Sequence, residues 1–127
     1  MERTVAENRS QNIVAGIVNI VSGTANRLFL TGLSVDIAKQ QANDSLAAMW
    51  EMLQVERPVD RITDLEPIFT TRDFIKTAFA ELGIEVEFSG KNEYEKGVII
   101  DVSPNDVLDF GLNADVLMPG QTVISIG

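Results

Sequence analysis

Two neighbouring carboxylates in this sequence have a residue type and a spacing that could support acid–base catalysis. Glu85 and Glu87 stand two residues apart in an alternating run, so both side chains would share one face of a strand. Two carboxylates can divide acid–base work when their surroundings separate their pKa values. The same alternation is also typical of a solvated strand face, and we favour that interpretation.

A second cluster of acidic and amide side chains lies between residues 101 and 109. Asp101, Asn105, Asp106 and Asp109 lie close together, but they lack the Asp-x-Asp-x-Asp-Gly order of a calcium loop. Helix capping and solubility explain these side chains better than metal coordination does. We therefore expect no metal site.

The composition excludes most other catalytic arrangements. The 127 residues include no Cys and no His, which removes thiolate nucleophiles, zinc–sulfur sites and the usual general base near neutral pH. Neither the glycine motif of dinucleotide binding nor that of the phosphate loop occurs. The sequence thus favours a protein that is not an enzyme, with no catalytic residue and no cofactor.

The charge balance limits the partners. Lys and Arg total 10 and Asp and Glu total 19, so the formal net charge is −9. The electrostatic field of this negative charge repels polyanions, which makes nucleic acid and acidic membrane surfaces poor partners. No apolar run approaches the roughly 20 residues that span a bilayer, and Glu2 and Glu7 interrupt any apolar leader. We expect a cytoplasmic protein.

Hydrophobic periodicity predicts one small α/β domain over residues 1–127, with three main helices on a short sheet. The helices are expected over 4–22, from Asn43 or Asp44 to 55, and from Thr70 or Thr71 to 82. The dense β-branched residues of the first helix argue mildly for a strand, but its polar positions keep helical spacing. The surest strands are the hairpin pair 84–88 and 98–102. Shorter strands are expected over 28–30, 61–65 and 121–126, and Ser103-Pro104 is typical of a helix start.

Several segments in fixed order resemble the GDP-mannose 4,6-dehydratase family. Residues 48–54 are similar to that family's Ala-Met-Trp-x-Met-Leu-Gln helix, and residues 71–79 to its Val-Arg-Glu-Phe-Val-x-x-Ala-Phe segment. Residues 90–97 resemble its Gly-Lys-Asn-Glu-x-Glu-x-Gly loop. The resemblance covers residues 12–104 and is strongest over 46–97.

This resemblance implies the C-terminal, sugar-nucleotide side of an extended short-chain dehydrogenase. The family's NADP-binding sheet has no counterpart in the sequence, and neither does the Tyr-x-x-x-Lys pair that carries out proton transfer. The family's nucleotide-contacting Lys-Arg-Asp-Trp falls near residues 36–39 and is not preserved, so that Ile37 stands where the family has Arg. What is implied is a non-catalytic relative without the NADP-binding domain.

Our leading hypothesis is that the chain self-associates as a homodimer or a larger oligomer. In the family, the corresponding helices pack on a cofactor domain, so this chain would have an apolar face left over, and such faces usually mark interfaces. We expect the interface at Ile13, Ile17, Ile20 and Val21.

Two alternatives remain open. One is a module that binds a nucleotide sugar weakly through the cations nearest the expected site, Arg27, Lys39 and Arg72. The other is part of a dehydratase that a partner chain completes by supplying the cofactor half.

Overall fold

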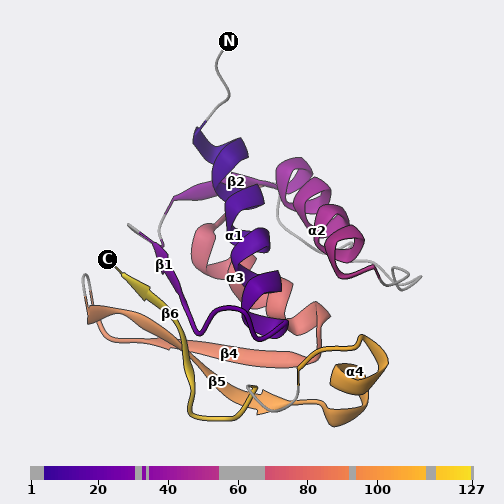
Figure 1. Cartoon of the computed structure of the whole chain (residues 1–127). Coiled ribbons are helices and arrows are strands. Elements are labelled where there is room, and N and C mark those ends of the chain that lie inside the picture. The colour runs from indigo at the N-terminus through magenta and orange to yellow at the C-terminus, as the bar shows by residue number, and fades with distance from the viewer. Residues whose placement is uncertain are drawn as a thin grey trace.

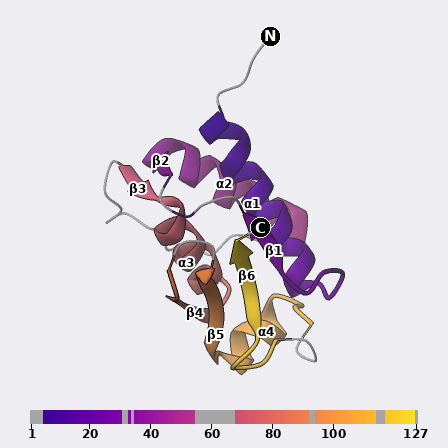
Figure 2. The same ribbon diagram turned by 90° about the vertical axis from the view of Figure 1, so that its left-hand side faces the viewer.

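The computed structural model of the chain describes residues 5–30, 33, 35–54, 68–91, 94–113 and 117–126. These residues form two layers, with the helices on one side of a four-stranded sheet and a two-stranded sheet beside the helices (Figure 1 and Figure 2). In chain order, the elements are α1 (Val5–Val21), β1 (Leu28–Leu30), β2 (Asp36–Ala38), α2 (Lys39–Leu53), β3 (Ile68–Thr70), α3 (Thr71–Glu81), β4 (Ile84–Ser89), β5 (Lys96–Val102), α4 (Pro104–Asp109) and β6 (Thr122–Ile126). The prediction of a small α/β domain is confirmed.

The four-stranded sheet has the order β1-β6-β5-β4, so β1 and β4 are its edges. The predicted hairpin is present as the antiparallel pair β4 and β5, in which Ile84 pairs with Val102 and Glu87 with Val98. β6 is antiparallel to β5 and parallel to β1. Residues nearly a hundred positions apart therefore become neighbours in one sheet.

One face of this sheet packs against the helices. Val86, Ile99 and Ile124 are buried on that face, in the same core as the apolar residues of α1 and α3. Gly16 of α1 lies so close to β1 that a Cβ atom there would stand 2.7 Å from Leu28 Cδ1. The approach of α1 to the sheet therefore depends on a residue without a side chain.

α1 is a helix, as predicted, although its C-terminal half is rich in β-branched residues. The expected interface residues Ile13, Ile17, Ile20 and Val21 are all fully buried in the core of the chain itself. Tertiary packing on more than one side of the helix outweighs the intrinsic strand preference of these residues. The helix ends as expected near Gly23, which takes a left-handed φ of 87°.

α2 begins earlier than predicted, at Lys39 rather than at Asn43 or Asp44. β2 runs directly into α2, so the last residue of β2, Ala38, stands at the N-cap position of the helix. Its side chain provides no hydrogen bond to the first turn. The start of α2 therefore has no side-chain cap that the sequence could reveal. The helix also ends without a glycine, since Gln54 takes the left-handed conformation with a φ of 59°.

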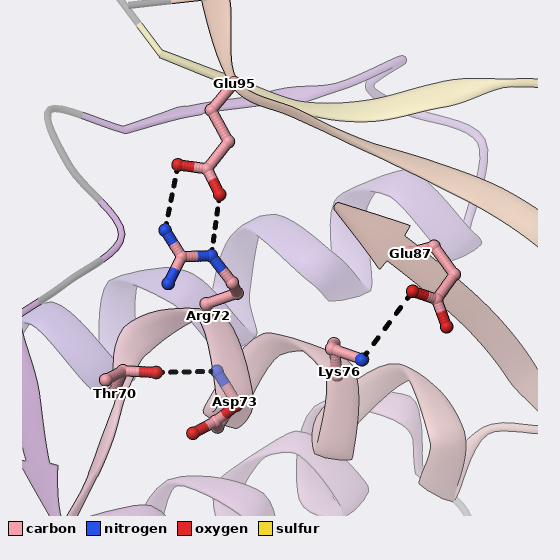
Figure 3. Close-up of polar contacts among 6 residues, drawn as sticks. All are labelled: Thr70, Arg72, Asp73, Lys76, Glu87 and Glu95. Atoms are coloured by element: carbon pink, nitrogen blue, oxygen red, sulfur yellow. Dashed lines mark hydrogen bonds and ion pairs between the residues drawn. The ribbon is translucent and has the colours of Figure 1, made fainter. Parts of the chain in front are cut away.

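α3 begins where the sequence predicts. The Thr70 hydroxyl accepts a hydrogen bond of 3.2 Å from the backbone N–H of Asp73, which satisfies a donor of the first turn (Figure 3). The short strand expected over residues 61–65 lies outside the described residues. The helix expected after Ser103 is α4.

Substitutions at Ile17 test the enclosure of α1. Ile17→Val should lower the free energy of unfolding by about 0.5–1.5 kcal/mol because one buried methyl group is lost. Ile17→Asp should abolish cooperative unfolding, since an unpaired buried charge costs several kcal/mol of a stability of about 5–15 kcal/mol. Thermal unfolding followed by circular dichroism gives both values.

Asn12→Asp is the matched control, because it adds the same charge at an exposed position of the same helix. A cooperative, wild-type-like transition for Ile17→Asp would contradict the placement of this residue in the core.

Candidate functional site

A groove of about 520 Å³ lies between α3 and the edge strand β4. Both elements supply its walls, and residues that follow the hairpin close one end. The lining residues are Lys76, Thr77, Ala80, Gly83, Ile84, Glu85, Val86, Glu87, Asp101 and Ser103. The groove exists because α3 packs over β4 through its buried face, with Phe74, Ala78 and Phe79 in the core.

The charges in the groove are predominantly negative. Glu85, Glu87 and Asp101 bring three carboxylates, and Lys76 brings one ammonium group. Lys76 Nζ lies 3.9 Å from Glu87 Oε1, at the edge of the sheet (Figure 3). Glu85 pairs directly with Asp101 across the hairpin, and like charges in that register repel each other. An anionic ligand such as a pyrophosphate is therefore disfavoured in this groove.

Glu85 and Glu87 are both exposed, on the outward positions of β4. Their interpretation as a solvated strand face is confirmed. Neither carboxylate has a buried environment that would distinguish it from the other.

Arg72, one of the three predicted binding cations, forms a bidentate ion pair. Its Nε donates to Glu95 Oε2 at 2.6 Å and its Nη2 donates to Glu95 Oε1 at 2.9 Å (Figure 3). The guanidinium carbon also lies 6.0 Å from the centre of the Phe88 ring. The hydrogen bonds that Arg72 donates to Glu95 raise the pKa of Arg72 above its ordinary value, although partial burial acts in the opposite direction.

This ion pair joins the first turn of α3 to the loop of the β4–β5 hairpin, because Glu95 stands directly before β5. The side chains are 32 % and 14 % exposed, so the pair is only partly screened by water. The backbone N–H of Arg72 donates to Leu33 O, which holds the same turn to the segment before β2. Arg72 thus connects three parts of the chain, and its charge is already compensated.

Arg27 lies elsewhere, at the other edge of the sheet. Its Nη1 donates to Ser125 Oγ at 3.1 Å, and its guanidinium carbon lies 5.9 Å from the centre of the Phe29 ring. Lys39 is the first residue of α2, and its side chain lies outside the described part of the chain. Neither Arg27 nor Arg72 lines the groove.

Glu95 is the residue that sequence reasoning missed. It stands in the polar loop expected between the two hairpin strands, 23 positions from Arg72. Sequence spacing does not reveal such a pair, because only the fold brings the loop to the start of α3. The repulsive pair of Glu85 and Asp101 also needed the hairpin register.

The described residues contain no group of three or more His, Cys, Asp or Glu side chains arranged to hold a metal ion. No helix among them is long and apolar enough to cross a bilayer.

Comparison with known proteins places these elements in a family. The family model described as GDP-mannose 4,6 dehydratase matches residues 3–110. The chain belongs to the GDP-mannose 4,6-dehydratase family. This match includes the whole of the segment whose motifs resemble that family.

Individual relatives agree with this assignment. A GDP-mannose 4,6-dehydratase of Vibrio cholerae serotype O1 is 30 % identical over 117 residues, which are 92 % of this chain and 30 % of that protein. One from Yersinia enterocolitica is 32 % identical over 94 residues, covering 74 % of this chain and 25 % of the relative. A human relative is 28 % identical over 88 residues, covering 69 % of this chain and 24 % of its own length. The chain thus spans about 30 % or less of the length of these dehydratases.

The ion pair of Arg72 and Glu95 should contribute measurably to stability. Arg72→Lys should lower the free energy of unfolding by about 1 kcal/mol, because an ammonium group cannot form both parallel hydrogen bonds. Urea denaturation measures the change. Lys76→Ala is the control on the same helix, since its long, exposed pair with Glu87 should contribute less than about 0.5 kcal/mol. Equal losses for the two variants would contradict the structural role of Arg72.

Proposed function

We propose that this chain is a non-catalytic member of the GDP-mannose 4,6-dehydratase family that self-associates, and that its affinity for a nucleotide sugar is too low to make it a binding module. The observation that carries the proposal is the charge of the groove beside β4, where three carboxylates face one ammonium group. A nucleotide sugar carries a pyrophosphate with two negative charges. The net charge of −9 adds a long-range field of the same sign.

The predicted binding cations support weak affinity as well. Arg72 is already paired with Glu95 in a bidentate arrangement, so a phosphate would have to displace a carboxylate. Ile37, which stands where the family has an Arg, is fully buried and offers no polar group. Phosphate recognition in proteins relies on forked guanidinium donors. The resemblance implies two such Arg contacts in the family, and Ile37 and, in an ungapped alignment, Leu108 stand at their positions here.

Self-association draws its support from exposed apolar side chains on the sheet. Phe29 is 60 % exposed and Ile100 is 45 % exposed, and both lie on strands of the four-stranded sheet. The α1 residues expected at the interface are enclosed in the chain's own core. An interface between copies with this fold would therefore use the sheet rather than α1.

One observation favours the alternative of a nucleotide-sugar-binding module. Arg27 beside the exposed Phe29 ring offers one cation and one aromatic surface, which suits weak binding of a nucleotide. The other alternative, part of a dehydratase that a partner chain completes, stays a prediction.

Titration with GDP-mannose, followed by calorimetry, tests the weak-binding proposal. Two lost charge-assisted contacts at about 1.5–3 kcal/mol each should turn a micromolar ligand into one with a dissociation constant of about a millimolar or weaker. Binding at tens of micromolar would overturn the proposal. Arg27→Ala, Lys39→Ala and Arg72→Ala would then identify the cation responsible.

Incubation of the purified chain with NADP and GDP-mannose tests the non-catalytic proposal. We expect no 4-keto-6-deoxy product above the background of a boiled sample, because the sequence offers no Tyr-x-x-x-Lys pair. The Vibrio cholerae relative serves as the positive control. Turnover that scales with the amount of this chain would refute the proposal.

A further inference from the structure

The four-stranded sheet has an outer face that turns away from α1 and α3. Figure 1 and Figure 2 show α1, α2 and α3 on the other side of this sheet, whereas α4 lies beside one end of it. The strand register identifies the outer side chains, because residues directly paired across neighbouring strands point to the same face. Leu28 packs against α1, so its neighbour Phe29 points outward.

A row of paired residues crosses one end of this outer face. Ser89 pairs with Lys96, Lys96 with Ser125, and Ser125 with Phe29, so that the row extends over four strands. The side chain of Arg27 reaches the same row through its hydrogen bond to Ser125 and its contact with Phe29. Lys96 and Arg27 are both exposed. This end of the face is therefore positively charged and carries an exposed aromatic ring.

The opposite end of the same face is acidic. Glu85 and Asp101 form a direct cross-strand pair there, four and five residues along their strands from the basic row. Both also line the groove beside α3, so this end of the face adjoins that groove at the β4 edge of the sheet. Both are exposed, and the ion pairs found among the described residues join other carboxylates, Glu95 and Glu87. Two like charges in register thus have no described cation between them. A positive group from outside the chain would relieve this repulsion.

Apolar surface lies between the two charged ends. Ile100 is the extra residue of a bulge, between the inward Ile99 and the outward Asp101, and it is 45 % exposed. Val98 is half-buried on the outward position that pairs with Glu87. The face thus has a basic end, an apolar middle and an acidic end.

We propose that this outer face binds a second copy of the same chain. The two sheets would face each other across a two-fold axis that lies between them and runs across the strands. This two-fold rotation places the basic row of one copy over Glu85 and Asp101 of the other. By symmetry the same contact forms a second time, with the two copies exchanged. An isologous interface has to be self-complementary in this way. The inference rests on the self-association in the proposed function and names its surface.

The size of the face predicts a weak dimer. The four strands are three to seven residues long, and at a spacing of about 4.8 Å they cover roughly 330 Å². Stable interfaces bury about 800 Å² on each partner. We therefore expect a dissociation constant of about 10–100 µM that rises with salt, because charge pairs at the rim of an interface are screened.

Sedimentation equilibrium over about 10 µM to 1 mM protein tests the proposal. The average mass of the wild-type chain should rise from 13.9 kDa towards twice that value. Lys96→Glu and Glu85→Lys should each weaken the dimer at least about tenfold, because each places like charges opposite one another at two symmetric positions. The double variant Lys96→Glu/Glu85→Lys should restore the affinity to within about threefold, since the charges are then exchanged.

The control variants lie on α2, on the far side of the helical layer. Glu51→Lys makes the same charge change as Glu85→Lys at another exposed position and should leave the dimer intact. If overall repulsion between acidic chains controlled association, Glu85→Lys would strengthen the dimer, because it makes each chain less negative. A weaker dimer in this variant therefore indicates the specific charge pairs of the proposed interface. Phe29→Ser should weaken the dimer, whereas Met52→Ser, which also removes an exposed apolar side chain, should not.

Two results would overturn the proposal in different ways. A dimer whose affinity is the same in Lys96→Glu, Glu85→Lys and Phe29→Ser would exclude this face while self-association stands. A chain that stays monomeric up to about 1 mM would exclude self-association itself, and the outer face would then have to be assigned to a different partner. Circular dichroism of each variant confirms that these exposed substitutions leave the fold intact.

Discussion

Enclosure of α1 is the constraint on which the rest of this structure depends. The helix contributes Ile13, Ile17 and Ile20 to one core that also holds α2, α3 and the inner face of the sheet. Gly16 lets it approach β1 closely. Because the apolar side chains Ile13, Ile17 and Ile20 are used inside the chain, they are not available to a partner. A hydrophobic helix in a sequence is therefore not by itself a sign of an oligomer interface.

The polar contacts of Arg72 hold this framework together. Arg72 and Glu95 connect the first turn of α3 to the hairpin, and their charges cancel. The groove between α3 and β4 carries more negative than positive side chains. Membership of the GDP-mannose 4,6-dehydratase family thus comes with a framework of helices and strands in which Arg72 is paired and Arg27 lies at the opposite edge of the sheet.

Local patterns account for the parts of the fold that could be predicted from the sequence. The alternation in residues 84–88 and 98–102 and the Thr70 cap of α3 act over a few residues, so they are visible in one segment at a time. The early start of α2 and its left-handed end at Gln54 have no such signal, because tertiary contacts set them. The pairing of β1 with β6 and the contact of Arg72 with Glu95 join segments distant in sequence. Arg72 itself was found as a cation, but its partner, and hence its role, required the fold.

Hydrogen–deuterium exchange of the α1 amides, measured at several protein concentrations, tests most directly whether this helix is core or interface. Core helices exchange only through global unfolding, so their protection reflects the stability of the single chain. We predict that the amides of residues 13–21 are among the slowest to exchange and that their protection is the same in dilute and in concentrated samples. Protection of these amides that appears only at concentrations where the chain associates would contradict the enclosure of α1 within one copy.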